Sequence, residues 1–163
     1  MHIKLARLGQ INMDEIIALN TNKRVLKQMP LAEGSVFDEN ACIAWVKGKE
    51  QQWAENGYGP WAILVDGKFA GWGGFQKEDE DADLALVLHP QYWGCGKQIF
   101  DEMICKAFGE MGFESITILL PPSRTKLKGI YALGFEQDGE MTYDGVRFIR
   151  YRLKKSNLKT IHA

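Results

Sequence analysis

The sequence contains few of the residues that build metal centres, disulfide frameworks or membrane spans. Three histidines and three cysteines occur in 163 residues, and Cys42, Cys95 and Cys105 have neither metal-ligand nor redox spacing. No apolar run approaches the roughly 18 residues that cross a bilayer, and no secretory signal follows Met1. We therefore expect a cytoplasmic location, no metal and no membrane partner, with Cys42 and Cys105 as small apolar residues on helices.

An excess of either charge is also lacking. The chain has 20 basic and 21 acidic residues, a formal net charge of -1, and no basic stripe, which excludes electrostatic binding to nucleic acid. Hydrophobic residues make up 45% and charged residues 25%, as in ordinary globular proteins. The length fits a single domain. We expect this domain over residues 1–155, followed by a polar, loose tail over 156–163.

The N-terminal third predicts a strand, a helix, an irregular stretch and a second helix. Residues 3–8 alternate as a strand does, and Asp14 can open a short helix. Residues 20–35 have no clear period and predict a loop, or a short helix and a loop. Asp38 is a good N-cap for the next helix, which Gly57 should end.

The middle of the chain predicts three consecutive strands. An apolar run over 61–65 and a second run over 68–75 flank Asp66-Gly67, a strong hairpin signal. The acidic residues 78–81 should form a solvated turn before a strand over 83–88.

The C-terminal half alternates helices and strands. An amphipathic helix should cover 99–111, a buried strand 115–120 and a basic helix 124–133. Two final strands should follow, over 135–142 and 146–153. The whole pattern predicts a mixed α/β domain.

A glycine turn between the strand over 83–88 and the amphipathic helix is suited to binding a phosphate. Unpaired amides and the positive dipole end of a helix attract anions, and Lys97 adds charge. Gly94 and Gly96 remove Cβ atoms where a ligand would approach closely. Glycines in this pattern also form plain tight turns, and neither a P-loop nor a dinucleotide fingerprint is present.

Two motifs resemble the GNAT superfamily of acetyl-CoA-dependent N-acetyltransferases. Residues 89–96, His-Pro-Gln-Tyr-Trp-Gly-Cys-Gly, resemble its H-P-x-Y-W-G-x-G signature, and residues 133–136 resemble its L-G-F-E string. The ribosomal-protein N-terminal acetyltransferases are the most similar subgroup. The resemblance implies an α/β (α+β) fold: a mixed, mostly antiparallel sheet of about seven strands, with a central V-shaped split and helices on both faces.

The resemblance also implies where acetyl-CoA binds. The cofactor would lie between the strand ending at Leu88 and the strand over 115–120. Backbone groups of Val87 and Leu88 would bind the pantetheine arm and the thioester carbonyl, and amides of residues 93–97 the pyrophosphate. The expected cofactor-binding residues are Val87, Leu88, Trp93, Gly94, Cys95, Gly96, Lys97, Gln98 and Ser123.

Three positions depart from the family pattern. Gln98 stands where the family usually has Gly or Ala, which is tolerable if its side chain points away from the phosphates. Ser123 stands in place of the usual Asn. Ile130 stands in place of a Tyr that often serves as general acid. Tyr131, one residue on, is rotated by about 100° around a helix and is expected to pack.

The reaction implied is direct attack of a primary amine on the thioester, without a covalent enzyme intermediate. The amide of Val87 or Leu88 would stabilise the oxyanion. Asp83 could deprotonate the amine directly or through water, or could be a solvent-facing strand-edge residue. Tyr143 is a weaker candidate acid. No neighbouring group supports Cys95 as a nucleophile.

Four questions stay open. The acceptor is either a protein N-terminus or a small-molecule amine, and the protein is either a monomer or a homodimer. A catalytically silent acyl-CoA-binding module is a second reading, favoured slightly by Ile130 and Gln98; a plain nucleotide-binding domain is poorly supported. Four tryptophans could line an acceptor cleft, although such spacing more often marks core residues: Trp45, Trp53, Trp61 and Trp72.

Overall fold

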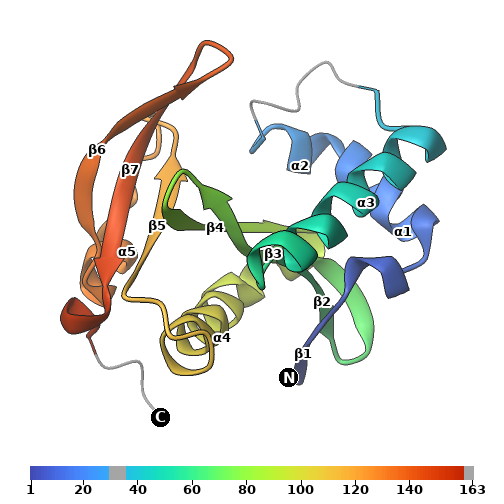
Figure 1. Ribbon diagram of the computed structural model, residues 1–163. Coiled ribbons are helices and arrows are strands. Elements are labelled where there is room, and N and C mark those ends of the chain that lie inside the picture. The colour runs from blue at the N-terminus through green and yellow to red at the C-terminus, as the bar shows by residue number, and fades with distance from the viewer. Residues whose placement is uncertain (30–35, 160–163) are drawn as a thin grey trace.

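Seven strands form an open sheet in the computed structural model, which describes residues 1–29 and 36–159 (Figure 1). They are β1 Ile3–Ala6, β2 Pro60–Val65, β3 Lys68–Glu78, β4 Asp81–Leu88, β5 Ser115–Leu120, β6 Glu136–Tyr143 and β7 Val146–Lys154. Their order across the sheet is β1-β2-β3-β4-β5-β7-β6, and every neighbouring pair except β4–β5 is antiparallel. The predicted mixed sheet is confirmed.

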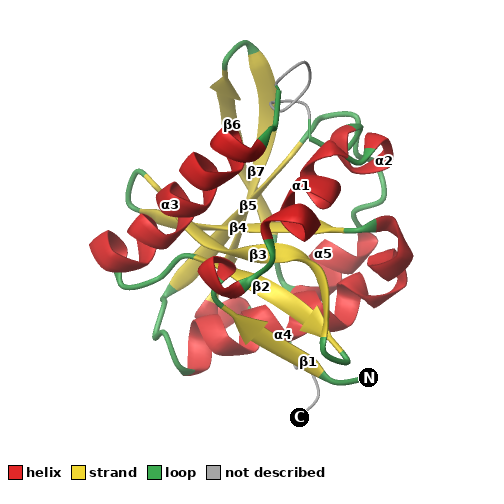
Figure 2. Ribbon diagram, turned by 90° about the vertical axis from the view of Figure 1, so that its right-hand side faces the viewer, coloured by secondary structure: helices red, strands yellow, loops and turns green. Residues whose placement is uncertain are grey.

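Helices cover both faces of this sheet (Figure 2). They are α1 Met13–Thr21, α2 Lys23–Leu26, α3 Glu39–Asn56, α4 Gly96–Gly109 and α5 Lys128–Leu133, with short 3-10 turns η1 Leu8–Gln10, η3 Pro90–Cys95 and η4 Lys155–Asn157. Successive side chains of β4 point to opposite faces. Accordingly, Ala85 and Val87 pack with a cluster that includes α1 and α2 residues, whereas Leu84 packs with buried residues of α4.

Local signals placed several boundaries correctly. Asp38 caps α3, since its Oδ1 accepts a 2.8 Å hydrogen bond from Ala41 N, and Gly57 ends the helix with φ +76°. Asp66 and Gly67 both have positive φ, as the predicted hairpin turn requires. Helix α1 is capped by Asn12, whose Oδ1 accepts from Asp14 N at 2.8 Å, so the helix begins before the expected Asp14.

The parallel strands β4 and β5 separate soon after they begin. Asp83 and Thr117 form the β4–β5 pair in the described chain, and the two strands continue to Leu88 and Leu120 without further pairing. Strand β5 is held on its other side, because it pairs with β7 over all six of its residues. The backbone edges that open beyond Asp83 form the V-shaped split.

Four predictions for particular segments need correction or lie outside the described residues. The expected basic helix over 124–133 begins only at Lys128: after Pro121-Pro122 the chain turns, with Arg124 N donating to Pro121 O at 2.9 Å. Residues 156–159, expected to be loose, pack onto α5, and Lys159 N donates to Leu133 O at 3.0 Å. Residues 30–35 and 160–163 are the ones outside the described range.

Cys42 and Cys105 differ in burial. Cys42 is buried, as expected of a small apolar residue, but Cys105 is exposed on α4 and does not serve the core. Within the described chain, every helix is too short or too polar to cross a membrane.

Candidate active site

A cavity of about 770 Å³ lies in the split between the ends of β4 and β5. Its walls come from both strands, from α2 on one face of the sheet, and from α4 and α5 on the other. Residues predicted from the sequence that line it are Asp83, Val87, Leu88, Trp93, Lys97 and Ile130. The volume is within the range typical of small-ligand sites.

The backbone of β4 presents alternate amides to this cavity. His89 N donates to Ala70 O of β3 at 2.8 Å. The amides of successive residues in an antiparallel strand point alternately toward and away from the neighbouring strand. Val87, two residues earlier, therefore directs its amide toward β3, whereas Leu88 directs its N–H into the split. Of the two predicted oxyanion donors, this geometry favours Leu88. Its carbonyl oxygen accepts a hydrogen bond from Trp93 Nε1 at 2.9 Å.

The glycine turn leads directly into α4. His89 Nδ1 accepts from Gln91 N, and the short helix η3 then passes into α4 at Gly96, where no side chain caps the first turn. A Cβ on Gly94 would have no neighbour within 4 Å, and one on Gly96 would meet only Leu88 Cδ1 at 3.9 Å. Gly96 also has an ordinary helical φ of -55°. Neither packing nor a positive φ requires these glycines, and the open space beside them leaves room for a phosphate group to approach the backbone.

Basic side chains surround the mouth of the cavity. Lys97 is highly exposed and forms an ion pair with Asp101 at 2.9 Å. Arg24 of α2 places its guanidinium 4.7 Å from the centroid of the Trp93 ring, and Arg124 and Lys126 line the cavity from the loop after β5. The sequence pattern does not predict Arg24, Arg124 and Lys126 as site residues; the basic run after β5 predicts a helix instead.

Five of the predicted cofactor residues are outside the lining of the cavity: Gly94, Cys95, Gly96, Gln98 and Ser123. Gln98 is exposed and does not line the cavity, as its tolerance at this position requires. Ser123 is also exposed, and Pro121 and Arg124 line the cavity beside it.

Asp83 lies at the apex of the split, where β4 and β5 meet. It is 8% exposed, and its Oδ1 accepts a 2.7 Å hydrogen bond from Thr117 Oγ1. Burial raises the pKa of Asp83 to about 7; the Thr117 bond opposes this rise, and the charges of Glu78 and Asp81 add to it. The alternative of a solvent-facing aspartate is therefore wrong, and this carboxyl group can exchange a proton near neutral pH.

The candidate acids are placed less favourably. Tyr143 donates its hydroxyl to Glu78 Oε2 at 2.8 Å, and burial together with this bond raises the pKa of Tyr143 to about 12. Ile130 lines the cavity, where the family's tyrosine is expected, whereas Tyr131 is 46% exposed and packs edge-on against Tyr151. The geometry agrees with a packing role for Tyr131.

The four tryptophans divide into two pairs. Trp53 donates to Pro60 O at 2.8 Å, and its ring lies beside Trp61, 9% exposed in the core. Trp45 and Trp72 meet at 5.3 Å on the face that also carries Asp83.

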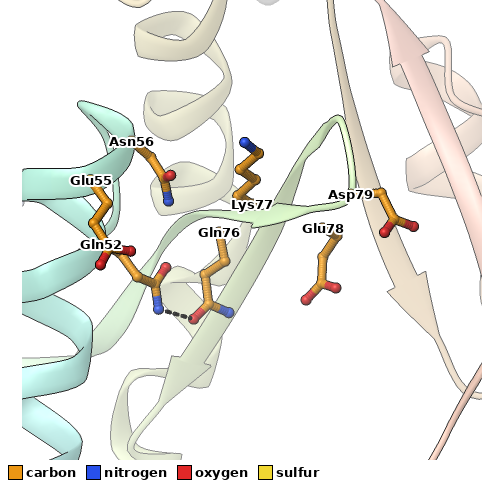
Figure 3. A pocket seen from close by; sticks show the side chains of 7 residues that line it. All are labelled: Gln52, Glu55, Asn56, Gln76, Lys77, Glu78 and Asp79. Atoms are coloured by element: carbon orange, nitrogen blue, oxygen red, sulfur yellow. Dashed lines mark hydrogen bonds between the residues drawn. The ribbon is translucent and has the colours of Figure 1, made fainter.

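A second, polar pocket of about 480 Å³ opens between α3 and the end of β3 (Figure 3). In it Gln52 Nε2 donates to Gln76 Oε1 at 3.2 Å.

Over residues 1–29 and 36–159, no group of His, Cys, Asp and Glu side chains is arranged to hold a metal ion.

Comparison with known proteins agrees with this geometry. Residues 4–155 match the family model described as Acetyltransferase (GNAT) domain. A GNAT-family acetyltransferase from Bacillus anthracis has a similar fold, with a TM-score of 0.74, 14% identity and 96% of each chain covered. Spermidine N-acetyltransferase from Vibrio cholerae, solved in complex with CoA and spermine, has a TM-score of 0.73 and 14% sequence identity. The match covers 95% of this chain and 96% of that one. An acetyltransferase from Agrobacterium tumefaciens str. C58 has a TM-score of 0.72 and 15% sequence identity, with 94% of this chain and 91% of that chain covered.

Proposed function

Because the chain belongs to the GNAT acetyltransferase family, we propose that it transfers an acetyl group from acetyl-CoA to a primary amine. The acceptor is a protein N-terminus or a small-molecule amine, and the reaction takes place in the cytoplasm. The eight-residue signature over 89–96 further favours kinship with the ribosomal-protein N-terminal acetyltransferases.

The observation that carries this proposal is that the glycine turn adjoins the split, since Trp93 and Lys97, on either side of residues 94–96, both line the cavity. Backbone amides of the glycine turn at the start of α4 bind the pyrophosphate, and Lys97 adds a positive charge beside them. From there the cavity leads along the open edge of β4 to Asp83. Acetyl-CoA, when bound, supplies the acetyl group as a thioester.

Within the split, the residues of the chain have separate tasks. The Leu88 N–H donates a hydrogen bond to the carbonyl oxygen that becomes negative during attack. Asp83, ionised above about pH 7, accepts a proton from the incoming ammonium group directly or through water. Val87, Leu86 and Phe100 give the cavity an apolar lining that limits access of water.

A catalytically silent acyl-CoA-binding module is the second candidate, and Ile130 is the observation that favours it. The cavity has an aliphatic side chain where the family often has a tyrosine acid, and Tyr143 is engaged by Glu78. Such a site would bind acyl-CoA but protonate the departing thiolate poorly.

One experiment separates the two candidates. The protein is incubated with acetyl-CoA and a panel of peptides with free N-termini, amino acids and polyamines, while thiol release and acetylated products are followed by absorbance and mass spectrometry. Amine-dependent thiol release with a matching acetylated product supports the transferase. Tight acetyl-CoA binding without release on any amine supports the silent module.

A further inference from the structure

Lys49 on α3 has an ammonium group enclosed by two indole rings and an amide. Its Nζ lies 4.6 Å from the centroid of Trp72 and 5.4 Å from that of Trp45, and it donates to Gln76 Oε1 at 2.6 Å. In the part of the chain that the structure describes, no carboxylate oxygen lies within 4 Å of this nitrogen. Lys49 is thus a half-buried cation with neutral contacts.

This arrangement leaves the positive charge of Lys49 poorly compensated. Burying an ammonium group is costly unless an anion pairs with it. Burial accordingly lowers the pKa of Lys49 to about 8, and the more distant charge of Glu78 opposes that shift. The nearby carboxylates already have other partners. Glu78 accepts from Tyr143, and Asp81 is bound by Arg152. Asp83 accepts from Thr117.

Lys49 lies outside the lining of the cavity, but over the face of the sheet that carries the Asp83 side chain. Its partner Gln76 is directly opposite Asp83 in the β3–β4 register, and Trp72 is opposite Val87. Directly opposed residues place their side chains on the same face of a sheet, with Cα atoms about 5 Å apart. A molecule that offers its amine to Asp83 on this face therefore comes close to the Lys49 ammonium.

A second hydrogen-bond donor lies in the same place. Trp72 is 5% exposed, and its Nε1 has no partner among the described residues. The ring that carries this N–H is the one that Lys49 contacts most closely. Lys49 itself has three N–H donors, of which Gln76 uses one. A carboxylate has two acceptor oxygens and could satisfy both this unpaired donor and the ammonium group.

We propose that Lys49 is a specificity residue that binds a carboxylate of the acceptor, so that the acetylated amine belongs to an amino-acid-like molecule. The inference rests on the proposed acetyl transfer and narrows its acceptor. A polyamine would instead bring a second cation toward Lys49 and Arg24, which like-charge repulsion disfavours.

The test compares acceptors that differ only in the negative charge. The panel contains α-, β- and γ-amino acids, the carboxamide of each, and spermidine, assayed at saturating acetyl-CoA. Wild-type protein should acetylate at least one free amino acid with a kcat/KM about tenfold or more above that of its carboxamide and of spermidine. Lys49→Met should remove that preference by raising KM for the acid form, and Lys49→Arg should retain most of it. Lys47→Met, an exposed lysine on the same helix, is the matched control and should behave as wild type.

Calorimetry with acetyl-CoA separates the possible failures. If acetyl-CoA binds and carboxamides or spermidine are acetylated as well as the free acids, the inference about Lys49 is wrong while the transferase proposal stands. The inference about Lys49 is equally wrong if folded Lys49→Met keeps the wild-type preference. If acetyl-CoA binds but no amine is acetylated, or if acetyl-CoA does not bind, the proposed function fails and the inference fails with it.

Discussion

Thr117 Oγ1 donates a 2.7 Å hydrogen bond to Asp83 Oδ1 at the pair that joins β4 to β5. The bond fixes the carboxylate at the apex of the split, where burial raises its pKa to about 7 although the bond itself lowers that pKa. One buried contact thus closes the sheet at its centre and orients the candidate base toward the cavity.

Replacing Asp83 should impair catalysis and leave cofactor binding intact. Asp83→Asn keeps the size of the side chain but cannot accept a proton, so kcat should fall by roughly 10²- to 10⁴-fold. In the wild type, kcat/KM should rise with pH and level off above about 7, and this limb should be absent from the variant. Unchanged turnover with an unchanged pH profile would rule out the base role.

Thr117→Val offers a companion measurement with a defined sign. The Thr117 hydrogen bond lowers the pKa of Asp83, so its loss should raise that pKa and move the rising limb of kcat/KM to higher pH. A limb that moves to lower pH, or does not move, would show that another group controls it.

Asp83 should also make stability depend on pH. Its pKa in the folded protein, about 7, lies above the usual value of 3.8, so the folded state binds more protons between these values. Protonated Asp83 therefore stabilises the folded state fully below about pH 4, and this stabilisation is lost as pH rises through 7. The loss in the free energy of unfolding is on the order of 4 kcal/mol. In denaturant unfolding, the free energy of unfolding of Asp83→Asn should increase relative to that of the wild type as pH rises from about 5 to 8. A constant difference between them would contradict the shifted pKa.

Ile130 and Tyr131 should respond differently to substitution. Ile130→Tyr introduces a hydroxyl into the cavity and should raise kcat about tenfold if protonation of the thiolate limits the rate. Tyr131→Phe should leave kcat unchanged, because this side chain is half exposed and packs on Tyr151. Loss of turnover in Tyr131→Phe would reverse the assignment of the two neighbours.

Arg152 should stabilise the sheet at the closed end of the split. Its guanidinium binds Asp81 at 2.7 and 3.0 Å, Asp138 at 2.8 Å and Ser115 at 3.0 Å, and so joins β4, β5, β6 and β7. Arg152→Met should lower the free energy of unfolding at pH 7 by about 1 kcal/mol, since partial exposure weakens the ion pairs. The same bonds lower the pKa of Asp81, so the difference from wild type should shrink as pH falls below 4. Arg147→Met, in an exposed pair with Glu140, is the control and should not change the melting temperature.

Much of the fold could be predicted because its signals are local. The N-cap at Asp38, the C-cap at Gly57 and the Asp66-Gly67 turn are each decided by a few adjacent residues, and each was placed correctly. The loop over 124–127 was misassigned because Arg and Lys favour helices in sequence patterns. Arg124 and Lys126 line the cavity instead, and no N-cap side chain starts the short helix that follows.

The candidate site was only partly predictable for a related reason. The glycine turn is continuous in sequence, and resemblance to a known family supplied its ligand. By contrast, three contacts bring together residues from separate elements: the Thr117–Asp83 hydrogen bond, the Arg24–Trp93 contact and the enclosure of Lys49. No local periodicity records such contacts, because they depend on how the sheet and helices pack.

Calorimetric titration of acetyl-CoA into the wild type and Gly96→Leu tests the central claim most directly. The turn should bind the cofactor's pyrophosphate, so the wild type should bind one equivalent, and Gly96→Leu should lose at least about tenfold in affinity because its side chain occupies the phosphate position. Folding should be unaffected, since a Cβ there has space; Gly109→Leu, at the far end of α4, should bind normally. Absence of binding by the wild type, or equal binding by Gly96→Leu, would contradict the account.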